Sequence, residues 1–579
     1  MQRSRVVDGL GSSEGSPPDG VEGKKPQQEH GHEQTQEKGV LTRESGGGAS
    51  RFLGSSSGIY FLHLVREAFS STGGSTDGIY DAEYLAGTYE DREATEILGE
   101  QTVGPISRDV GERLIMPYFR YLHPLLPFLD GRQFVHEFET KAYSGRPVSA
   151  AMACSFKAVL SIGLLEYPEL RGAVAGRSRD WFSGGARDAR AHAMALLGCP
   201  VDVGALEALL AVQVYLFVSM QIRAAYELGG LIRSKMYVAG LHRCPARYPT
   251  VFNEAECMQR KRILWSAYAL DHHLSQTLGL PIGYVDADID VCPLLSERHI
   301  QGADVPEPEG NEASFSDDSD IINNSGDPLR IARAFSDYHR LVGRVVETFN
   351  KSLHVRAVEP REALALQADI ERWWNGLPEG LTGQNPDPDL PFDNSAFFTV
   401  LYHQVVLLVN RPRLSLSADT PEFHYAMQVG VDCGRRILAA MTQQETQHGH
   451  TQTLFWPGYM SAVWNAGLII SFACKLDCYP LSRGIREVRQ CLPICDAMLR
   501  RWPAAARCRQ ILQTILDAME KDPNRKSNSQ TPNTTYPPSS TDTNAVLEAI
   551  AANTDFIQQP PNSVIDFDDD VFNLFSMNW

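Results

Sequence analysis

Apolar residues recur with a helical period through the middle of this 579-residue chain, from Ser107 to about Asp522, and no other feature limits its fold as strongly. One segment shows the pattern clearly, because its apolar residues fall at i, i+4 and i+7 on one helix face: Ile331, Phe335, Tyr338, Leu341, Val342, Val345 and Phe349. Comparable patterns occupy residues 205–241, 397–409, 424–441, 460–476 and 492–519. Alternating runs bounded by hairpin turns are scarce. The sequence therefore predicts an all-α fold, a large multi-helix domain of packed helix pairs over residues 107–521.

The segments around this domain differ from it in composition. Residues 1–50 contain no aromatic residue and are rich in Gly, Ser, Glu and Gln, so they cannot bury enough surface to offset chain entropy. We expect a disordered tail there, followed by a lead-in segment over residues 51–106. Residues 296–328 carry nine acidic residues against a single Arg298 and predict a solvated, mobile loop within the domain. Residues 522–579 are polar again and predict a disordered acidic tail.

The charge of the chain argues against direct binding to nucleic acid. Lys and Arg total 53 against 71 Asp and Glu, which gives a net charge of −18, and the duplex is itself strongly negative. The sharpest basic run is Arg260, Lys261 and Arg262. It is either a nuclear-import or nucleic-acid patch or, as we favour, a solvated helix face in which Glu256 pairs with Arg260 at i, i+4.

Neither a membrane span nor a secreted scaffold is indicated. The longest apolar stretch, residues 460–476, is shorter than a span and contains Asn465, which favours a buried helix. Eleven cysteines in a chain without a secretory start favour a soluble intracellular protein with reduced thiols.

Motifs that would carry catalysis or bind metals are incomplete. Residues 54–58 fit G-x-S-x-G but follow no strand, and the acidic run that begins at Asp286 has Val291 where a calcium loop needs glycine. His272 and His273 are adjacent and point to different sides of a helix. Four cysteines at i, i+4 spacing could in principle meet around zinc, although buried thiols explain them better: Cys474, Cys478, Cys491 and Cys495. We therefore expect no enzyme and assign no catalytic, cofactor or metal residue.

A dense aromatic segment marks the expected core. Five aromatic residues fall within residues 118–134, while the His123-Pro124 pair and Pro127 prevent one continuous helix. The segment predicts a packed corner of the domain, although a ligand-facing role stays open. The candidate core residues are Tyr118, Phe119, His123, Pro124, Phe128, Trp265, Trp373 and Trp374.

An ordered series of segments resembles a known family. The segments are YFRYLHPLLPFLDGRQF at 118–134, the stretch 237–293, ADIERWWNGLPEGL at 368–381 and YHQVVLLVNRPRL at 402–414, preceded by RFLGSSSGIYFL at 51–62. Together they resemble the regulatory middle homology domain, of xylanolytic-activator type, of fungal binuclear zinc-cluster transcription factors. The likeness covers about residues 51–520. It departs from the family where Leu280 replaces the usual Arg of Leu-Gly-Arg-Pro and where His272 replaces a common Arg.

The resemblance implies a regulator of RNA polymerase II transcription in the nucleus, acting on a metabolic or secondary-metabolite gene set. Family members hold two zinc ions through six N-terminal cysteines, whereas no cysteine precedes Cys154 here. We therefore expect no cofactor in this chain. The expected partners are a second copy or another zinc-cluster factor, with DNA reached only where a missing N-terminal module or such a partner supplies the contact. The alternative function is a cluster-less co-regulator or inhibitor that binds another zinc-cluster factor.

The end of the chain is the candidate activation segment, residues 564–579. Its apolar residues Phe567, Val571, Leu574 and Phe575 share one helical face, with Phe572 beside them, and acidic residues occupy the first turn. A helix this short is only marginally stable in isolation, and it would fold when it binds in a groove of a partner. The pattern is typical of an acidic-hydrophobic segment that recruits transcription machinery or a co-activator. The alternative is that it packs on its own chain or does nothing.

Overall fold

The computed structural model describes residues 40–43, 50–53, 99–101, 103, 106–172, 185–198, 202–296, 327–349, 360–382, 394–448 and 455–521. These ranges are helical apart from turns, one isolated bridge and one short hairpin, so the predicted all-α fold is confirmed. Most of the loop 296–328 and all of residues 522–579, including the candidate activation segment with Phe567, Val571, Phe572, Leu574 and Phe575, lie outside the described residues.

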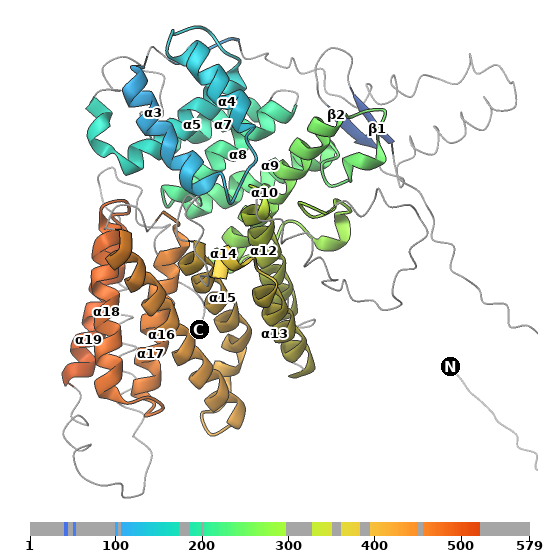
Figure 1. Ribbon diagram of the computed structural model, residues 1–579. Coiled ribbons are helices and arrows are strands. Elements are labelled where there is room, and N and C mark those ends of the chain that lie inside the picture. Colours follow the sequence, from blue (N-terminus) through green and yellow to red (C-terminus); the bar gives the residue numbers. More distant parts are fainter. Residues whose placement is uncertain are drawn as a thin grey trace, which may run out of the picture.

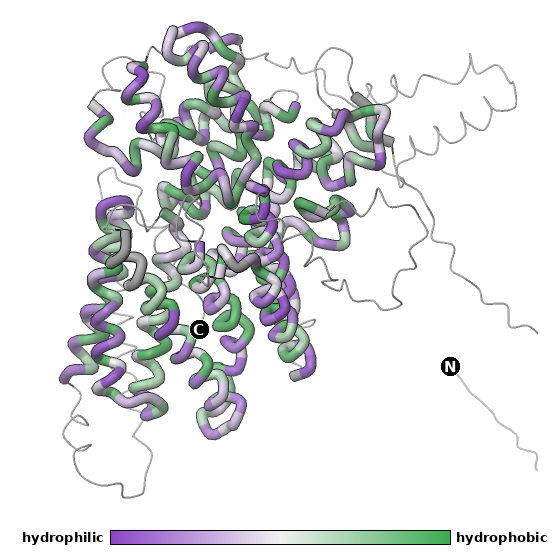
Figure 2. Tube along the Cα trace, in the orientation of Figure 1, coloured by the Kyte–Doolittle hydropathy of each residue, from purple (hydrophilic) through white to green (hydrophobic). Residues whose placement is uncertain are grey.

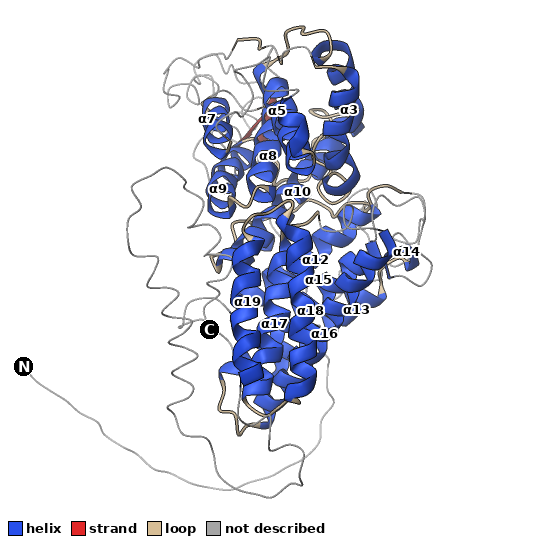
Figure 3. Cartoon of the chain, turned by 90° about the vertical axis from the view of Figure 1, so that its left-hand side faces the viewer, coloured by secondary structure: helices blue, strands red, loops and turns tan. Residues whose placement is uncertain are grey.

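The helices form two tiers (Figures 1 and 3). The upper tier contains α3 (Arg108–Pro117), α4 (Gly131–Glu137), α5 (Ala150–Glu166), α7 (Ala186–Leu197), α8 (Val203–Val218) and α9 (Ile222–Val238), and α10 (Glu254–Leu278) leads down from it. The lower tier contains α12 (Arg330–Phe349), α13 (Pro360–Asn375), α14 (Glu379–Thr382), α15 (Asn394–Asn410), α16 (Pro421–His448), α17 (Gly458–Lys475), α18 (Leu481–Leu499) and α19 (Ala505–Lys521). Shorter helical turns join them, of which Tyr118–Leu122 (η1) and Arg411–Ser415 (η6) matter below.

Neighbouring helices in sequence pack as pairs. α5 packs on α3 and α8, α8 on α9, and α10 on α9 and α12, while α15 to α19 pack successively against one another. Hydrophobic and hydrophilic segments alternate along the outer helices α18 and α19 (Figure 2), as expected for helices with one face on the core. None of the described helices is both long and apolar enough to cross a bilayer.

Local sequence fixes where the central helices begin. The Asp202 carboxylate accepts a hydrogen bond from the Ala205 N–H at 2.7 Å and caps α8. α10 begins with a capping box, in which Asn253 accepts from the Glu256 N–H and Glu256 accepts from the Asn253 N–H. α10 ends at Gly279, whose φ of 66° lies in the left-handed region that glycine adopts without strain.

The expectation of a disordered tail over residues 1–50 does not hold for residues 40–43 and Ser50, which belong to a short hairpin. β1 (Val40–Arg43) pairs antiparallel with β2 (Ser50–Leu53), with Val40 opposite Leu53. Leu41 is buried against Gly240, just beyond α9, where a Cβ atom would stand 2.4 Å from Leu41 Cδ1. The contacts that hold this hairpin come from residues about 200 positions further along the chain, so the composition of residues 1–50 could not reveal them.

Several side-chain contacts join the two tiers. Arg501, in the turn before α19, forms an ion pair with Glu166 at the end of α5. Trp502 Nε1 donates to the Val218 carbonyl at the end of α8, over 2.8 Å. The rings of Tyr121 and Phe455 stack with their centroids 5.3 Å apart. The tiers therefore share buried aromatic and charged contacts and form a single body.

Candidate functional site

The aromatic segment 118–134 is a packed corner of the upper tier. Tyr118 and Phe128 are fully buried, and their rings meet edge to face with centroids 6.0 Å apart. Phe119, His123 and Pro124 are half-buried beside them. A ring nitrogen of His123 lies 3.1 Å from the Leu129 carbonyl oxygen, and burial lowers the pKa of His123 to about 4. The corner is thus built around neutral rings and backbone carbonyls.

Two side chains of α10 hold this corner by donating hydrogen bonds to its backbone carbonyls. Arg262 donates from Nε to the Pro127 carbonyl and from Nη2 to the Leu129 carbonyl, both over 2.8 Å. Gln259, one turn earlier on α10, donates to the Phe128 carbonyl over 2.6 Å. Prolines 124 and 127 prevent regular helix hydrogen bonding here, so these carbonyls need partners from elsewhere. Arg262 is therefore a structural residue of the corner.

The basic run on α10 is neither a nucleic-acid patch nor a solvated face, which corrects both interpretations of the sequence. Arg260 is 2% exposed and donates to Ser50 Oγ at 2.9 Å and to the Ala239 carbonyl at 2.6 Å. Its guanidinium also lies over the Phe252 ring, 4.3 Å from the centroid. Lys261 is buried as well. The expected partner Glu256 instead serves the capping box. Arg260 therefore anchors the hairpin and Arg262 the corner.

The three candidate core tryptophans sit in the helix layers around α10 and α12. Trp265 is buried on α10 and donates from Nε1 to the Cys292 carbonyl at 2.9 Å. Trp373 is buried on α13 and donates to the Ala334 carbonyl at 3.1 Å. Trp374 is half-buried and packs against Tyr402, with ring centroids 4.8 Å apart.

A largely buried carboxyl group lies behind the corner. Glu207 of α8 accepts a hydrogen bond from Gln259, and desolvation raises the pKa of Glu207 to about 8. Sequence reasoning missed this residue, because a single Glu in an apolar helix carries no motif. Its partners are protein groups, so it stabilises the joint between α8 and α10.

Two adjacent histidines are more deeply buried than the sequence suggested. His272 stacks on Tyr268, with ring centroids 3.9 Å apart, and its Nδ1 lies 2.9 Å from the Tyr268 carbonyl. His273 meets Trp456 and Phe217 at ring edges, and burial lowers the pKa of His273 to about 3. They face different neighbours, as expected of adjacent residues on a helix.

The cysteine pairs lie among apolar groups in the described residues. Cys474, Cys491 and Cys495 are buried, while Cys478 is half-buried. Cys495 Sγ lies 3.7 Å from Cys508 Sγ of α19, and burial raises the pKa of Cys491. Within the described ranges no group of three or more His, Cys, Asp or Glu residues is placed to hold a metal ion.

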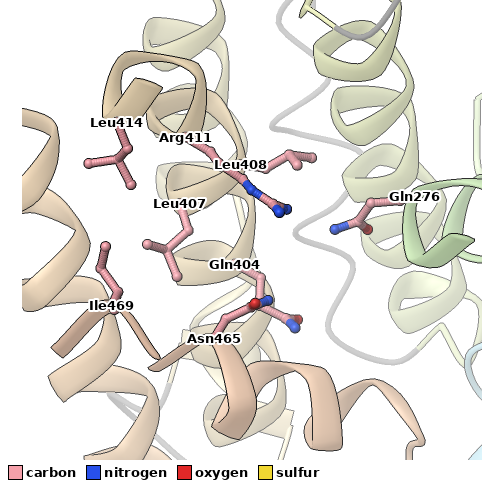
Figure 4. Close-up of a pocket in the computed structure, with 8 residues that line it drawn as sticks. All are labelled: Gln276, Gln404, Leu407, Leu408, Arg411, Leu414, Asn465 and Ile469. Atoms are coloured by element: carbon pink, nitrogen blue, oxygen red, sulfur yellow. The ribbon is translucent and has the colours of Figure 1, made fainter. Parts of the chain in front are cut away.

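A pocket lies where α10 meets the lower tier, between α10, α15 with η6, and α17 (Figure 4). Its empty space is about 600 Å³, part of it open to solvent. We name it the amide pocket after three of its lining residues, and its full lining is Gln276, Gln404, Leu407, Leu408, Arg411, Leu414, Asn465 and Ile469. Burial lowers the pKa of Arg411 below its ordinary value. The sequence did not predict that these residues line one pocket, because they are up to about 190 positions apart. Asn465 appeared there only as the polar residue of an apolar stretch, and residues 404–414 only within a segment that resembles the family.

Comparisons with known proteins agree with one another. Residues 115–374 match the fungal specific transcription factor domain. The chain is 31% identical to the probable transcription factor FUP6 of Fusarium proliferatum over 559 residues, 84% of this chain and 78% of that protein. It is 22% identical to the transcriptional activator protein acu-15 of Neurospora crassa over 64% of this chain, and spans 38% of that relative's length. No solved structure matches the chain.

Proposed function

Because this chain belongs to the family of fungal transcription factors that carry the fungal specific transcription factor domain, we propose that it acts in the nucleus on RNA polymerase II transcription. It is a fungal transcription regulator, as the matches to FUP6 and acu-15 indicate. The gene set proposed for it is metabolic or secondary-metabolite, since the sequence resembles regulators of that kind. The observation that carries the proposal is the match to FUP6 along most of both chains.

The residues that stood out in the sequence serve the architecture of the fold. Arg260, Arg262, the aromatic corner and Glu207 all have hydrogen-bond partners inside the fold. The protein names found by the comparisons are those of transcription regulators. In this proposal the two helical tiers form a platform, and the acidic segment 564–579 recruits transcription machinery or a co-activator.

A tethered reporter assay tests the proposal. The full chain is fused to a foreign DNA-binding domain, and reporter output is compared with that of a fusion lacking residues 564–579. We expect output to fall severalfold, because the deletion removes every apolar anchor of the segment. The matched control deletes residues 527–542, which are equally long, polar and without Lys or Arg. Unchanged output after the first deletion, with expression confirmed by immunoblot, would contradict the role of the segment.

A second candidate function is a co-regulator that binds another zinc-cluster factor. Residues 1–153 of this sequence contain no cysteine that could bind zinc, and in this function the partner supplies the cluster that contacts DNA. In that case the tethered full chain gives no activation at all. It instead co-purifies with a zinc-cluster protein and lowers transcription from that protein's promoters when it is overproduced.

A further inference from the structure

The amide pocket has one polar and one apolar side (Figure 4). Gln276 of α10 and the guanidinium of Arg411 extend toward each other, and the amides of Gln404 and Asn465 lie below them. The aliphatic side chains of Leu407, Leu414 and Ile469 gather on the other side. Pockets that lie between helices and hold a few convergent polar groups are typical sites for small molecules.

The polar side has unused hydrogen-bonding capacity. Within the described residues the side-chain amides of Gln276 and Asn465 take part in no hydrogen bond. Gln404 donates to the Gly458 carbonyl and to Ser461 Oγ, but both distances are long at 3.4 Å. Each amide group offers two donors and an acceptor. Three amides from three helices can therefore bind polar atoms placed between them.

The charge of the pocket favours an anion. Arg411 is the only charged residue among the eight that line it, so the lining carries a positive charge in a chain whose net charge is −18. Arg411 has a contact of its own within the protein, but a guanidinium has five N–H donors and can bind further acceptors. Its partial desolvation is unfavourable for a cation, and a bound carboxylate would relieve that cost.

The apolar side is closely supported from behind. A Cβ atom at Gly430 of α16 would stand 2.9 Å from Ile469 Cγ1 and 3.7 Å from Leu407 Cδ2. The absence of a side chain at this position allows α16 to pack directly against the two residues and fixes the wall they form. A wall of branched aliphatic groups suits a short hydrocarbon chain.

We propose that the amide pocket binds a small anionic amphiphile, a carboxylate with a short aliphatic body and further oxygen atoms. Arg411 binds the carboxylate, the three amides bind the additional oxygens, and the aliphatic body lies on Leu407, Leu414 and Ile469. The ligand contacts α10 of the upper tier together with α15 and α17 of the lower tier, so its binding stabilises their joint arrangement. The site stands on its own geometry and does not depend on the activation segment.

Thermal unfolding of the purified full chain tests this binding. The probes are hexanoate and 2-oxohexanoate, compared with neutral hexanamide and cationic hexylammonium. We expect a saturable rise in Tm with both carboxylates, larger for 2-oxohexanoate because its keto oxygen can accept from an amide donor. Hexanamide should raise the Tm less, and hexylammonium should not raise it.

Variants locate the binding. Arg411→Gln should weaken the apparent affinity for 2-oxohexanoate about tenfold or more, because a charge-assisted hydrogen bond is lost. Gln276→Ala, on a different helix, should weaken it by a smaller factor and serves as the deciding variant if circular dichroism shows that Arg411→Gln does not fold. Arg483→Gln removes an exposed arginine of α18, outside the pocket, and should leave the affinity unchanged.

Two results would overturn the proposal. One is the absence of a saturable rise with either carboxylate, or an equal rise with hexanamide. The other is unchanged affinity in the folded pocket variants. Neither result depends on the reporter assay, so a failure of the ligand site and a failure of the activation segment are separately visible.

Discussion

Glu207 is a carboxyl group that the fold keeps largely protonated at neutral pH. Desolvation dominates its environment, and the donor it has, Gln259, also donates to the Phe128 carbonyl. A carboxyl of ordinary pKa 4.5 raised to about 8 makes the folded state bind a proton that the unfolded state releases. Its contribution to stability is therefore complete below pH 4.5 and is lost as the pH rises through 8.

Replacing Glu207 with Gln should remove this pH dependence. Between pH 6 and pH 8.5 we expect the wild type to lose about 2 kcal/mol of unfolding free energy that Glu207→Gln retains, because the amide has no proton to release. Urea unfolding followed by circular dichroism at both pH values measures the difference. Glu227→Gln, on the exposed surface of α9, is the control. Parallel loss in wild type and Glu207→Gln would mean that the carboxyl is ionised in the folded state.

At the scale of the element, two glycines show how helix packing depends on what surrounds each position. Gly163 of α5 faces α3 so closely that a Cβ atom would stand 2.0 Å from the Leu114 carbonyl oxygen. Gly230 of α9 has no atom within 4 Å of its Cβ position. Gly163 is required because α3 and α5 cross there at close range. Gly230 makes no such contact and only adds conformational entropy to the unfolded chain.

The two alanine substitutions should therefore act in opposite directions. Gly163→Ala should destabilise the protein by about 2 kcal/mol or more, because backbone atoms of α3 must move. Gly230→Ala should stabilise it by up to about 1 kcal/mol through helix propensity. Thermal unfolding of the two variants beside the wild type measures both effects. A neutral Gly163→Ala would show that α3 and α5 can separate at no cost.

Sequence patterns predicted the helices because the apolar residues that form the buried face of a helix recur with a helical period in its own segment. The periodicity at 331–349 matches α12, and the prolines at 124 and 127 indicated the corner. The sequence did not predict which side chains contact segments that are distant in the chain. Arg260 appeared as a surface charge because its acceptors, Ser50 and the Ala239 carbonyl, are supplied by other elements. The amide pocket was missed for the same reason, since its polar groups come from three helices.

At the scale of the whole molecule, the junction between the tiers contains uncharged imidazole rings. His273 of α10 lies between Phe217 of α8 and Trp456 in the turn before α17, with ring centroids 5.2 and 5.0 Å away. His339 of α12 follows at 5.8 Å, and burial also lowers its pKa. These rings contact both tiers, so their protonation is unfavourable for the joint fold.

Acid should therefore loosen the molecule at this junction. The folded pKa of His273, about 3, lies below its ordinary value of 6.5, so stability is complete above pH 6.5 and is lost as the pH falls toward 3. Between pH 7 and pH 5 we expect the wild type to lose about 2 kcal/mol more unfolding free energy than His273→Phe, which keeps an aromatic ring and has no proton to bind. Urea unfolding at both pH values measures the difference, with His136→Phe on the exposed face of α4 as the control. Equal acid sensitivity of wild type and His273→Phe would mean that solvent reaches the junction and that the tiers separate more easily than their contacts indicate.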